Sequence, residues 1–391
     1  MRGLLRALVL LVSIVLAAPS FAGDSTGVTA DTIKIGLFGP LTGAASVVQK
    51  NVFGAAAIYK DVNDNGGIHG RKIELVIEDD GCNPNKGIAA VKKLLYQDQV
   101  FLLHGAWCSS VALAIKPEAA KNPLVPYMVL GAVSTEISTP LLPNLFHPVA
   151  TTQTAGSQMA EFALSKPGMK KIAIIAHSDE WGTIYAKAAI ERLKESNIEP
   201  VINVALERGA TDATTQVLSI KQTAPDAVLA FLFPAELAIY LRDAYKFGLR
   251  TTTVGSTAAS IDDTDKRLGI PSALKDVYMA YPLAGSITSP EMAKFAKIFS
   301  THYPSEALDT MSFYTMGGAI AIVEALRRTG PDVTREGVIA ELDKLKDFDT
   351  GVQSSNMTFS PDDHRGIRSI KMIGLVKQRE VLFDKYPAVV R

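Results

Sequence analysis

The stretch TIKIGLFG, residues 32–39, and the run from Val47 to Asn63 decide the predicted fold. The first is apolar and rich in β-branched side chains, which is typical of a buried strand, and Gly39-Pro40 breaks it. The second has apolar residues at helical spacing and ends at the Asn65-Gly66-Gly67 turn. Together they predict a strand followed by a helix, the repeating unit of a parallel sheet covered by helices.

The same alternation continues along the chain. Strand-like runs at 72–77, 100–103, 125–129, 171–176, 200–205, 227–231 and 252–255 alternate with helix-like runs at 84–97, 109–119, 155–164, 182–196, 213–223 and 235–247. A length of 391 residues exceeds what one core usually organises. The sequence therefore predicts an α/β fold with two doubly wound, Rossmann-like lobes. Residues 309–345 are helical in pattern, and the strand-like runs 370–376 and 381–383 could complete either sheet, so we expect several crossings between the lobes.

The amino-terminal residues have the pattern of a secretory signal peptide. Arg2 and Arg6 are positively charged, Leu8 to Ala18 is an uncharged apolar run, and Ser20-Phe21-Ala22 offers small residues to a signal peptidase. A membrane anchor or a disordered tail is the alternative, but the run is shorter than the ~20 residues of a spanning helix. We therefore expect cleavage after Ala22 and export of a soluble protein to the periplasm.

Charge and motif content argue against several classes of function. Forty Lys and Arg balance forty Asp and Glu without a long run of either sign, which argues against nucleic acid and acidic lipid as partners. The GxSxG, GxxxxGK[ST], GxGxxG and HExxH motifs are absent from the sequence. We therefore expect no enzyme, no cofactor and no metal. The acidic run Glu78-Asp79-Asp80 could mark a cation site, but a solvated strand end is the simpler interpretation.

The sequence has two cysteines, Cys82 and Cys108. An even number of cysteines in an exported chain favours a disulfide because the compartment is oxidising, and two buried free thiols are the alternative.

Several motifs resemble those of the branched-chain amino-acid-binding proteins. They are IKIG at 33–36, GPLTG at 39–43, VNDNGGIHGRKI at 62–73, DDGCNP at 79–84 and WCSS at 107–110, and the resemblance runs to about Lys377. It implies a type I periplasmic-binding fold, in which three crossovers join two lobes that close around a ligand by hinge motion. On this basis we expect residues 28–147 and 282–356 in lobe 1, and residues 148–281 and 357–391 in lobe 2. The resemblance also implies a monomeric solute-binding protein that delivers its ligand to the membrane permease of an ABC importer.

A ligand site between the lobes also follows from the resemblance. Hydroxyl groups of Ser109 and Ser134, with main-chain groups near Ala132, would hold a ligand carboxylate. A helix that begins at Ser109 presents free N–H groups there, although a plain N-cap role of this serine is the alternative. Trp181 and Phe233 would sandwich an apolar or aromatic ligand body, unless they belong to the hinge core. Weaker candidates for the wall of lobe 1 are Trp107, Val48 and Met311.

Thr257 departs from the pattern of the amino-acid-binding members. The resemblance places a glutamate there, where it pairs with the ligand ammonium, and a threonine cannot neutralise a cation. Burying an unpaired ammonium costs several kcal/mol, so we expect an amine-free acid such as a benzoate or a phenylpropanoid. Amino acids remain an alternative, since Asp179, Glu180 or Glu236 could supply the charge. A sensory binding protein is a second alternative, and a secreted enzyme is a third.

Overall fold

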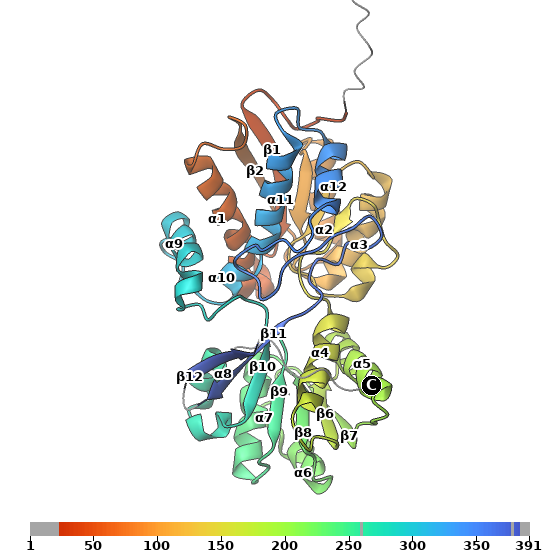
Figure 1. The fold of residues 1–391 in the computed structure, drawn as a ribbon, viewed down its shortest axis with the longest axis vertical. Helices are drawn as coiled ribbons and strands as arrows, with labels where there is room; N and C mark the ends of the chain where they lie inside the picture. The colour runs from red at the N-terminus through yellow and green to blue at the C-terminus, as the bar shows by residue number, and fades with distance from the viewer. Residues whose placement is uncertain (1–22, 259–260, 377–378, 384–391) are drawn as a thin grey trace, which may run out of the picture.

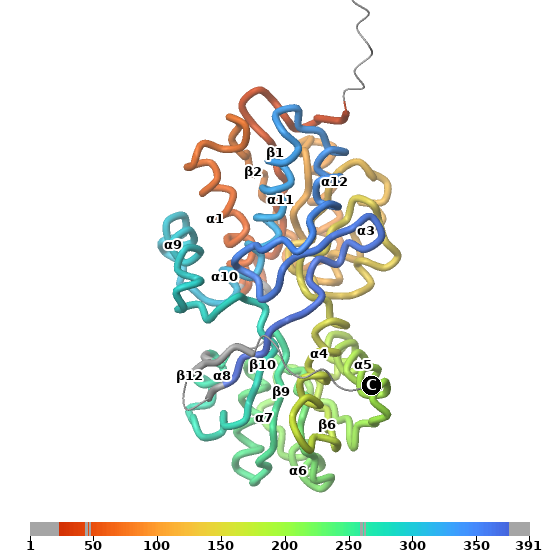
Figure 2. Tube along the Cα trace, in the orientation of Figure 1, coloured from red at the N-terminus to blue at the C-terminus, as the bar shows by residue number. Residues whose placement is uncertain are grey.

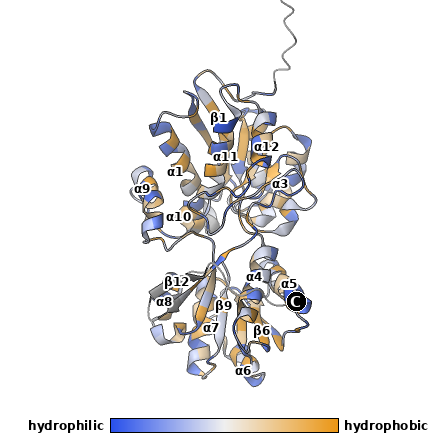
Figure 3. Ribbon diagram, in the orientation of Figure 1, coloured by the Kyte–Doolittle hydropathy of each residue, from blue (hydrophilic) through white to orange (hydrophobic). Residues whose placement is uncertain are grey.

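The computed structural model describes residues 23–258, 261–376 and 379–383, and the expected signal peptide at 1–22 lies outside them. Figure 1 shows two lobes, one above the other. Apolar residues concentrate on the strands and on the helix faces turned toward them (Figure 3). Within the described residues, no helix is both long enough and apolar enough to cross a membrane.

Lobe 1 is built on a parallel sheet with the strand order β2-β1-β3-β4-β5. Side chains of β1 alternate between its two faces, so that Ile35 and Leu37 pack in the core with α1, whereas Phe38 packs with α2 and α3. Helices thus cover both faces, as a doubly wound lobe requires. The elements are β1 (Thr32–Gly39), α1 (Lys50–Asp64), β2 (Lys72–Asp79), α2 (Pro84–Tyr96), β3 (Leu102–Gly105), α3 (Ser109–Lys121), β4 (Tyr127–Val129) and β5 (Leu145–Phe146).

Lobe 2 holds a second sheet, with the strand order β12-β11-β10-β9-β8-β6-β7. Its strands are parallel except for β11 and β12, which pair antiparallel at one edge, so the late strands complete this sheet. The strands are β6 (Ile172–His177), β7 (Ile202–Leu206), β8 (Ala227–Phe231), β9 (Thr252–Gly255), β10 (Val277–Tyr281), β11 (Lys371–Val376) and β12 (Arg379–Phe383). The helices are α4 (Thr152–Ser165), α5 (Glu180–Glu195), α6 (Thr214–Gln222), α7 (Pro234–Lys246) and α8 (Ile261–Leu268).

Four later helices return to lobe 1, where α9, α10 and α11 pack against α1. The approach is close at Gly54 of α1, because a Cβ there would lie 2.4 Å from the Ser312 carbonyl oxygen. The helices are α9 (Ala293–His302), α10 (Met311–Tyr314), α11 (Met316–Thr329) and α12 (Arg335–Asp343). The predicted two-lobed α/β fold is therefore confirmed.

Within the described residues the chain passes between the lobes three times, after β5, after β10 and before β11 (Figure 2). Residues 353 and 354 are hydrogen-bonded to both of the first two crossings. Gln353 Nε2 donates to the Pro148 carbonyl in the first crossing (2.7 Å), and the Ser354 N–H donates to the Pro282 carbonyl in the second (2.9 Å). The His364 ring stacks on Phe146 of lobe 1, with 4.1 Å between ring centroids. We therefore propose that the third crossing begins after 366, later than the boundary at 357 expected from the sequence.

Candidate functional site

The carboxyl ends of the parallel strands in the two sheets face each other. Strand β5 leads directly into the first crossing and β10 into the second, so both sets of strands run toward the other lobe. Open parallel sheets bind ligands beyond these ends. The loops after β3 and β4 in lobe 1, and after β6, β8 and β9 in lobe 2, therefore carry the candidate site.

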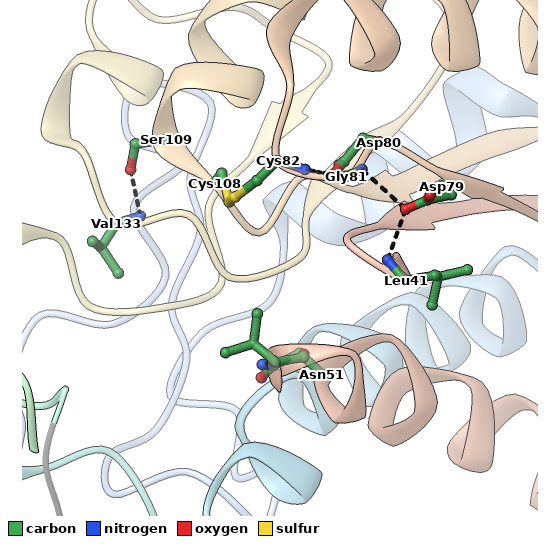
Figure 4. Close-up of a disulfide and its surroundings, with 10 residues drawn as sticks. Leu41, Asn51, Asp79, Asp80, Gly81, Cys82, Cys108, Ser109 and Val133 are labelled. Atoms are coloured by element: carbon green, nitrogen blue, oxygen red, sulfur yellow. Dashed lines mark hydrogen bonds between the residues drawn. A yellow bond between two sulfur atoms is a disulfide. The ribbon is translucent and has the colours of Figure 1, made fainter. Parts of the chain in front are cut away.

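The predicted disulfide between Cys82 and Cys108 is confirmed, with 5.6 Å between the Cα atoms (Figure 4). It ties the loop after β2 to the start of α3. The neighbouring acidic residues serve this loop: Asp79 accepts hydrogen bonds from the N–H groups of Leu41 and Gly81, and Asp80 accepts one from Cys82. Turn N–H groups therefore occupy these carboxylates, but Asp80 is buried and not solvated as the sequence suggested.

Ser109 is the first residue of α3, and its hydroxyl oxygen accepts hydrogen bonds from the N–H groups of Val133 (3.3 Å) and Ser134 (3.2 Å). Figure 4 shows Ser109 turned toward Val133. This serine therefore fixes the loop after β4. Within the described residues, the Ser109 and Ser110 N–H groups and the Ser134 hydroxyl have no hydrogen-bond partner. These three unused donors, which we call the donor cluster, lie where the sequence predicted a carboxylate site.

The main-chain groups of Ala132 have partners inside lobe 1. Its carbonyl oxygen accepts from His147 Nε2 at 2.7 Å, and its N–H donates to the Ala106 carbonyl at 3.2 Å. Their predicted contact with the ligand stays a prediction. The preceding Gly131 is required by Trp107, because a Cβ at Gly131 would lie 2.3 Å from the indole ring.

Two residues that were not predicted from the sequence, Asn51 and Tyr314, contact the predicted wall residues of lobe 1. Asn51 in α1 donates from Nδ2 to the Val48 carbonyl oxygen at 2.9 Å, and the same atom lies 3.5 Å from the Met311 sulfur. It thereby brings these two candidates together. Tyr314 of α10 packs edge-on against Trp107, with ring centroids 5.3 Å apart. Neither Asn51 nor Tyr314 was predicted as a site residue, because both lie in helical stretches without a motif.

Trp181 and Phe233 lie at the facing edge of lobe 2, where the sequence placed them, but their rings touch each other. Their centroids are 4.8 Å apart at an interplanar angle of 36°, which leaves no room for a ligand between them. The expected sandwich is therefore wrong. Trp181 also packs on Tyr185 at 4.6 Å, and the Arg208 guanidinium lies 3.9 Å from the Phe233 ring centre. A ligand would meet an aromatic surface formed by Trp181 and Phe233, with the buried Tyr185 packed behind Trp181.

His177, at the end of β6, is hydrogen-bonded to the backbone of Phe233, one of the residues of this aromatic surface. Its Nε2 accepts from the Phe233 N–H at 3.0 Å, so Nδ1 carries the proton and donates to the Leu206 carbonyl oxygen at 3.2 Å. Burial, followed by the positive Arg208, lowers the pKa of His177. The neutral ring thus holds the backbone of Phe233 in place.

The acidic side chains of lobe 2 that could have faced a ligand ammonium mostly have partners. Asp179 caps α5 through the Gly182 N–H and pairs with Arg208. Glu236 is buried and accepts from the Gly209 N–H at 2.7 Å. Glu180 is exposed on the first turn of α5.

Thr257 follows β9, and its hydroxyl oxygen lies 3.2 Å from that of Tyr185. Tyr185 is buried, which raises its pKa to about 12, so it remains a neutral phenol in ordinary buffers. At position 257, where the resemblance led us to look for a glutamate, the chain therefore has a neutral hydroxyl group next to the neutral Tyr185 hydroxyl group.

Comparison with known proteins agrees with this geometry. The model of a family described as periplasmic binding protein matches residues 32–379. The chain belongs to this family. Members of the family are binding proteins without catalytic activity, so this periplasmic binding protein is not an enzyme.

Several curated proteins and solved structures are similar over most of the chain. An amino acid binding protein of Pseudomonas aeruginosa is 28% identical over 270 residues, 68% of this chain and 71% of that protein. The Leu/Ile/Val-binding protein homolog 7 of Brucella abortus is 24% identical over 388 residues, 96% of each chain. The structure of a branched-chain amino acid ABC transporter protein from Thermus thermophilus with bound valine has a TM-score of 0.78, at 17% identity over 92% of this chain and 97% of that one.

Proposed function

We propose that this periplasmic binding protein is the solute-binding component of an ABC importer. It holds a small carboxylate between its lobes and delivers it, as a monomer, to a permease in the inner membrane. The observation that carries the proposal is the donor cluster at the start of α3, with two unused N–H groups and the unused Ser134 hydroxyl. Free N–H groups and the helix dipole both favour an anion at such a place.

Amino acids are the first candidate ligands. The names of the relatives from Pseudomonas and Brucella support this class, as does the valine bound to the Thermus protein. In this chain Glu180 is an exposed acidic residue on that edge of lobe 2, and it would face the ammonium group.

An amine-free acid with an aromatic or branched body is the second candidate. The neutral pair of Tyr185 and Thr257 supports it, because a buried ammonium without a carboxylate partner costs several kcal/mol. The aromatic surface of lobe 2 offers such a body a large apolar contact.

A thermal-shift experiment on residues 23–391 tests the proposal and separates the candidates. Leucine, isoleucine and valine form one ligand group, benzoate and 3-phenylpropanoate form the other, and glucose is the uncharged control. A ligand at one hundred times its Kd adds about 2.7 kcal/mol of stability, which corresponds to roughly 3–4 °C in Tm for a chain of this length. We expect a shift of this size from at least one acid. Tm values that stay within about 1 °C for all five acids would contradict a small-carboxylate site.

A further inference from the structure

A cavity of about 350 Å³ lies in lobe 2, at the edge of the sheet that points away from lobe 1. Its walls come from the carboxyl-terminal half of α7, from the short helix η3 (Pro271–Leu274) and from the residues that begin β9 and β10. The candidate site between the lobes lies at the carboxyl ends of these strands, so the two sites have no residue in common. The volume of the cavity falls within the range of ligand pockets, which is about 300–1,000 Å³.

Tyr240 of α7 lines this cavity and carries a buried hydroxyl group without a partner. The residue has no exposed surface, and within the described residues its hydroxyl group forms no hydrogen bond. Burial raises the pKa of Tyr240 more than its polar neighbour Thr253 lowers it, so the group is a neutral phenol. An unpaired buried hydroxyl group is costly, so an acceptor atom supplied by a bound molecule would stabilise it.

The inner wall around Tyr240 is otherwise largely apolar. The buried apolar residues that line it are Leu241, Ala244, Leu249 and Val277. Such a wall favours a ligand with an apolar body, because few polar groups are available to replace the water that a polar body would lose.

The rim of the cavity is exposed and carries two cations and one acid. The Arg250 guanidinium lies 4.0 Å from the Tyr245 ring centre and donates from Nη1 to the Ala244 carbonyl oxygen at 3.1 Å, which holds it in place. Lys275 is exposed, and within the described residues neither cation forms an ion pair. Asp276 is the acid, so two positive charges stand against one negative charge and the rim favours an anion.

We propose that this cavity is a second ligand site and that its ligand is a small organic anion with an apolar body. The anionic group binds Arg250 and Lys275 at the rim, and a neutral oxygen at the inner end accepts a hydrogen bond from Tyr240. The burial of these groups fixes this order, because the hydroxyl group is buried whereas the cations are exposed. 4-Acetylbenzoate combines the three parts and serves as the probe.

Isothermal titration calorimetry on residues 23–391 tests the proposal with three matched compounds. 4-Isopropylbenzoate lacks the acceptor oxygen of 4-acetylbenzoate, and 4-acetylbenzamide lacks its charge. We expect both to bind at least fivefold more weakly than 4-acetylbenzoate. Because the site between the lobes is also expected to take carboxylates, Ala273→Trp fills the cavity and should abolish this binding, whereas Ser134→Ala should leave it within twofold.

Two conservative variants assign the contacts. Tyr240→Phe should weaken 4-acetylbenzoate by about fivefold to tenfold and leave 4-isopropylbenzoate within twofold. Lys275→Gln should weaken both acids by at least twofold and leave 4-acetylbenzamide unchanged. Tyr303→Phe and Lys297→Gln, at α9 of lobe 1, are the matched controls and should change none of the affinities.

The outcomes keep this site distinct from the one between the lobes. Binding that is lost in Ser134→Ala and unchanged in Ala273→Trp would place the probe between the lobes and overturn the inference. Unchanged affinity in Tyr240→Phe also overturns it, as does a complete absence of binding, and these two results decide even if Ala273→Trp does not fold. None of these results contradicts the carboxylate site between the lobes, which is tested separately.

Discussion

Ser134→Ala is the substitution that addresses the carboxylate site with the least disturbance of the fold. The Ser134 hydroxyl is unused within the described residues, and the residue is only 4% exposed. A hydrogen bond from such a shielded group to a carboxylate contributes about 1.5–3 kcal/mol. The variant should therefore bind its best ligand roughly 10- to 150-fold more weakly. Its unfolding free energy should change by less than about 0.5 kcal/mol, because no internal partner is lost.

Ser109→Ala is the informative comparison, because its hydroxyl has a structural role as well. It accepts two N–H groups, from Val133 and Ser134, and their loss should destabilise the fold by about 1–2 kcal/mol. The corresponding fall in Tm is roughly 1–3 °C for a chain of this length. Calorimetric titration measures affinity and differential scanning calorimetry measures Tm, with the exposed Ser300→Ala in α9 as control. If Ser134→Ala folds normally and binds within twofold of the parent protein, the carboxylate does not lie at the donor cluster.

Three further predictions concern the disulfide, a buried acid and ligand selectivity. Replacing Cys82 and Cys108, which are 26 residues apart, by serine should lower the unfolding free energy in urea by about 3–4 kcal/mol, and an unchanged midpoint would contradict the stabilising role of the bridge. Burial raises the pKa of Asp80 to about 6, so the folded state holds this proton more tightly than the unfolded chain and loses stability as the pH rises from about 4 to about 6. Asp80→Asn should therefore stabilise the protein at pH 7.5 by up to about 3 kcal/mol and by much less at pH 4.5, and equal effects at both pH values would contradict this assignment. Thr257→Glu should shift the preference toward leucine over 3-phenylpropanoate in calorimetric titrations, and an unchanged ratio would mean that residue 257 does not face this part of the ligand.

The alternation of strand-like and helix-like runs was sufficient to predict both lobes, because apolar period and turn residues are local signals. The sheet to which β11 and β12 belong was not predictable from local pattern, since the pairing of β11 with β10 depends on a contact about 90 residues away in the chain, and only the family resemblance placed these strands in lobe 2. Position after a strand placed Trp181 and Phe233 on the correct edge. Their mutual contact depends on side-chain packing across two loops, for which the sequence has no signal.

The two serines of the expected carboxylate site illustrate the same limit. Sequence position put both beside the start of α3, and the structure brings them together. That Ser109 is occupied by the loop after β4, whereas Ser134 is unused, follows from hydrogen-bond geometry alone. Tyr314 was not predicted because it lies within the uncharged helical stretch 310–323, where a tyrosine usually belongs to the core.

The central claim is that a ligand carboxylate binds at the start of α3, and one calorimetric titration tests it most directly. The acid that binds best to residues 23–391 is compared with its methyl ester, which keeps the carbon skeleton but loses the negative charge. Two or three charge-assisted hydrogen bonds and the helix dipole are lost with that charge. The account predicts one site for the acid and at least about 100-fold weaker binding of the ester. Equal affinity for acid and ester would contradict it.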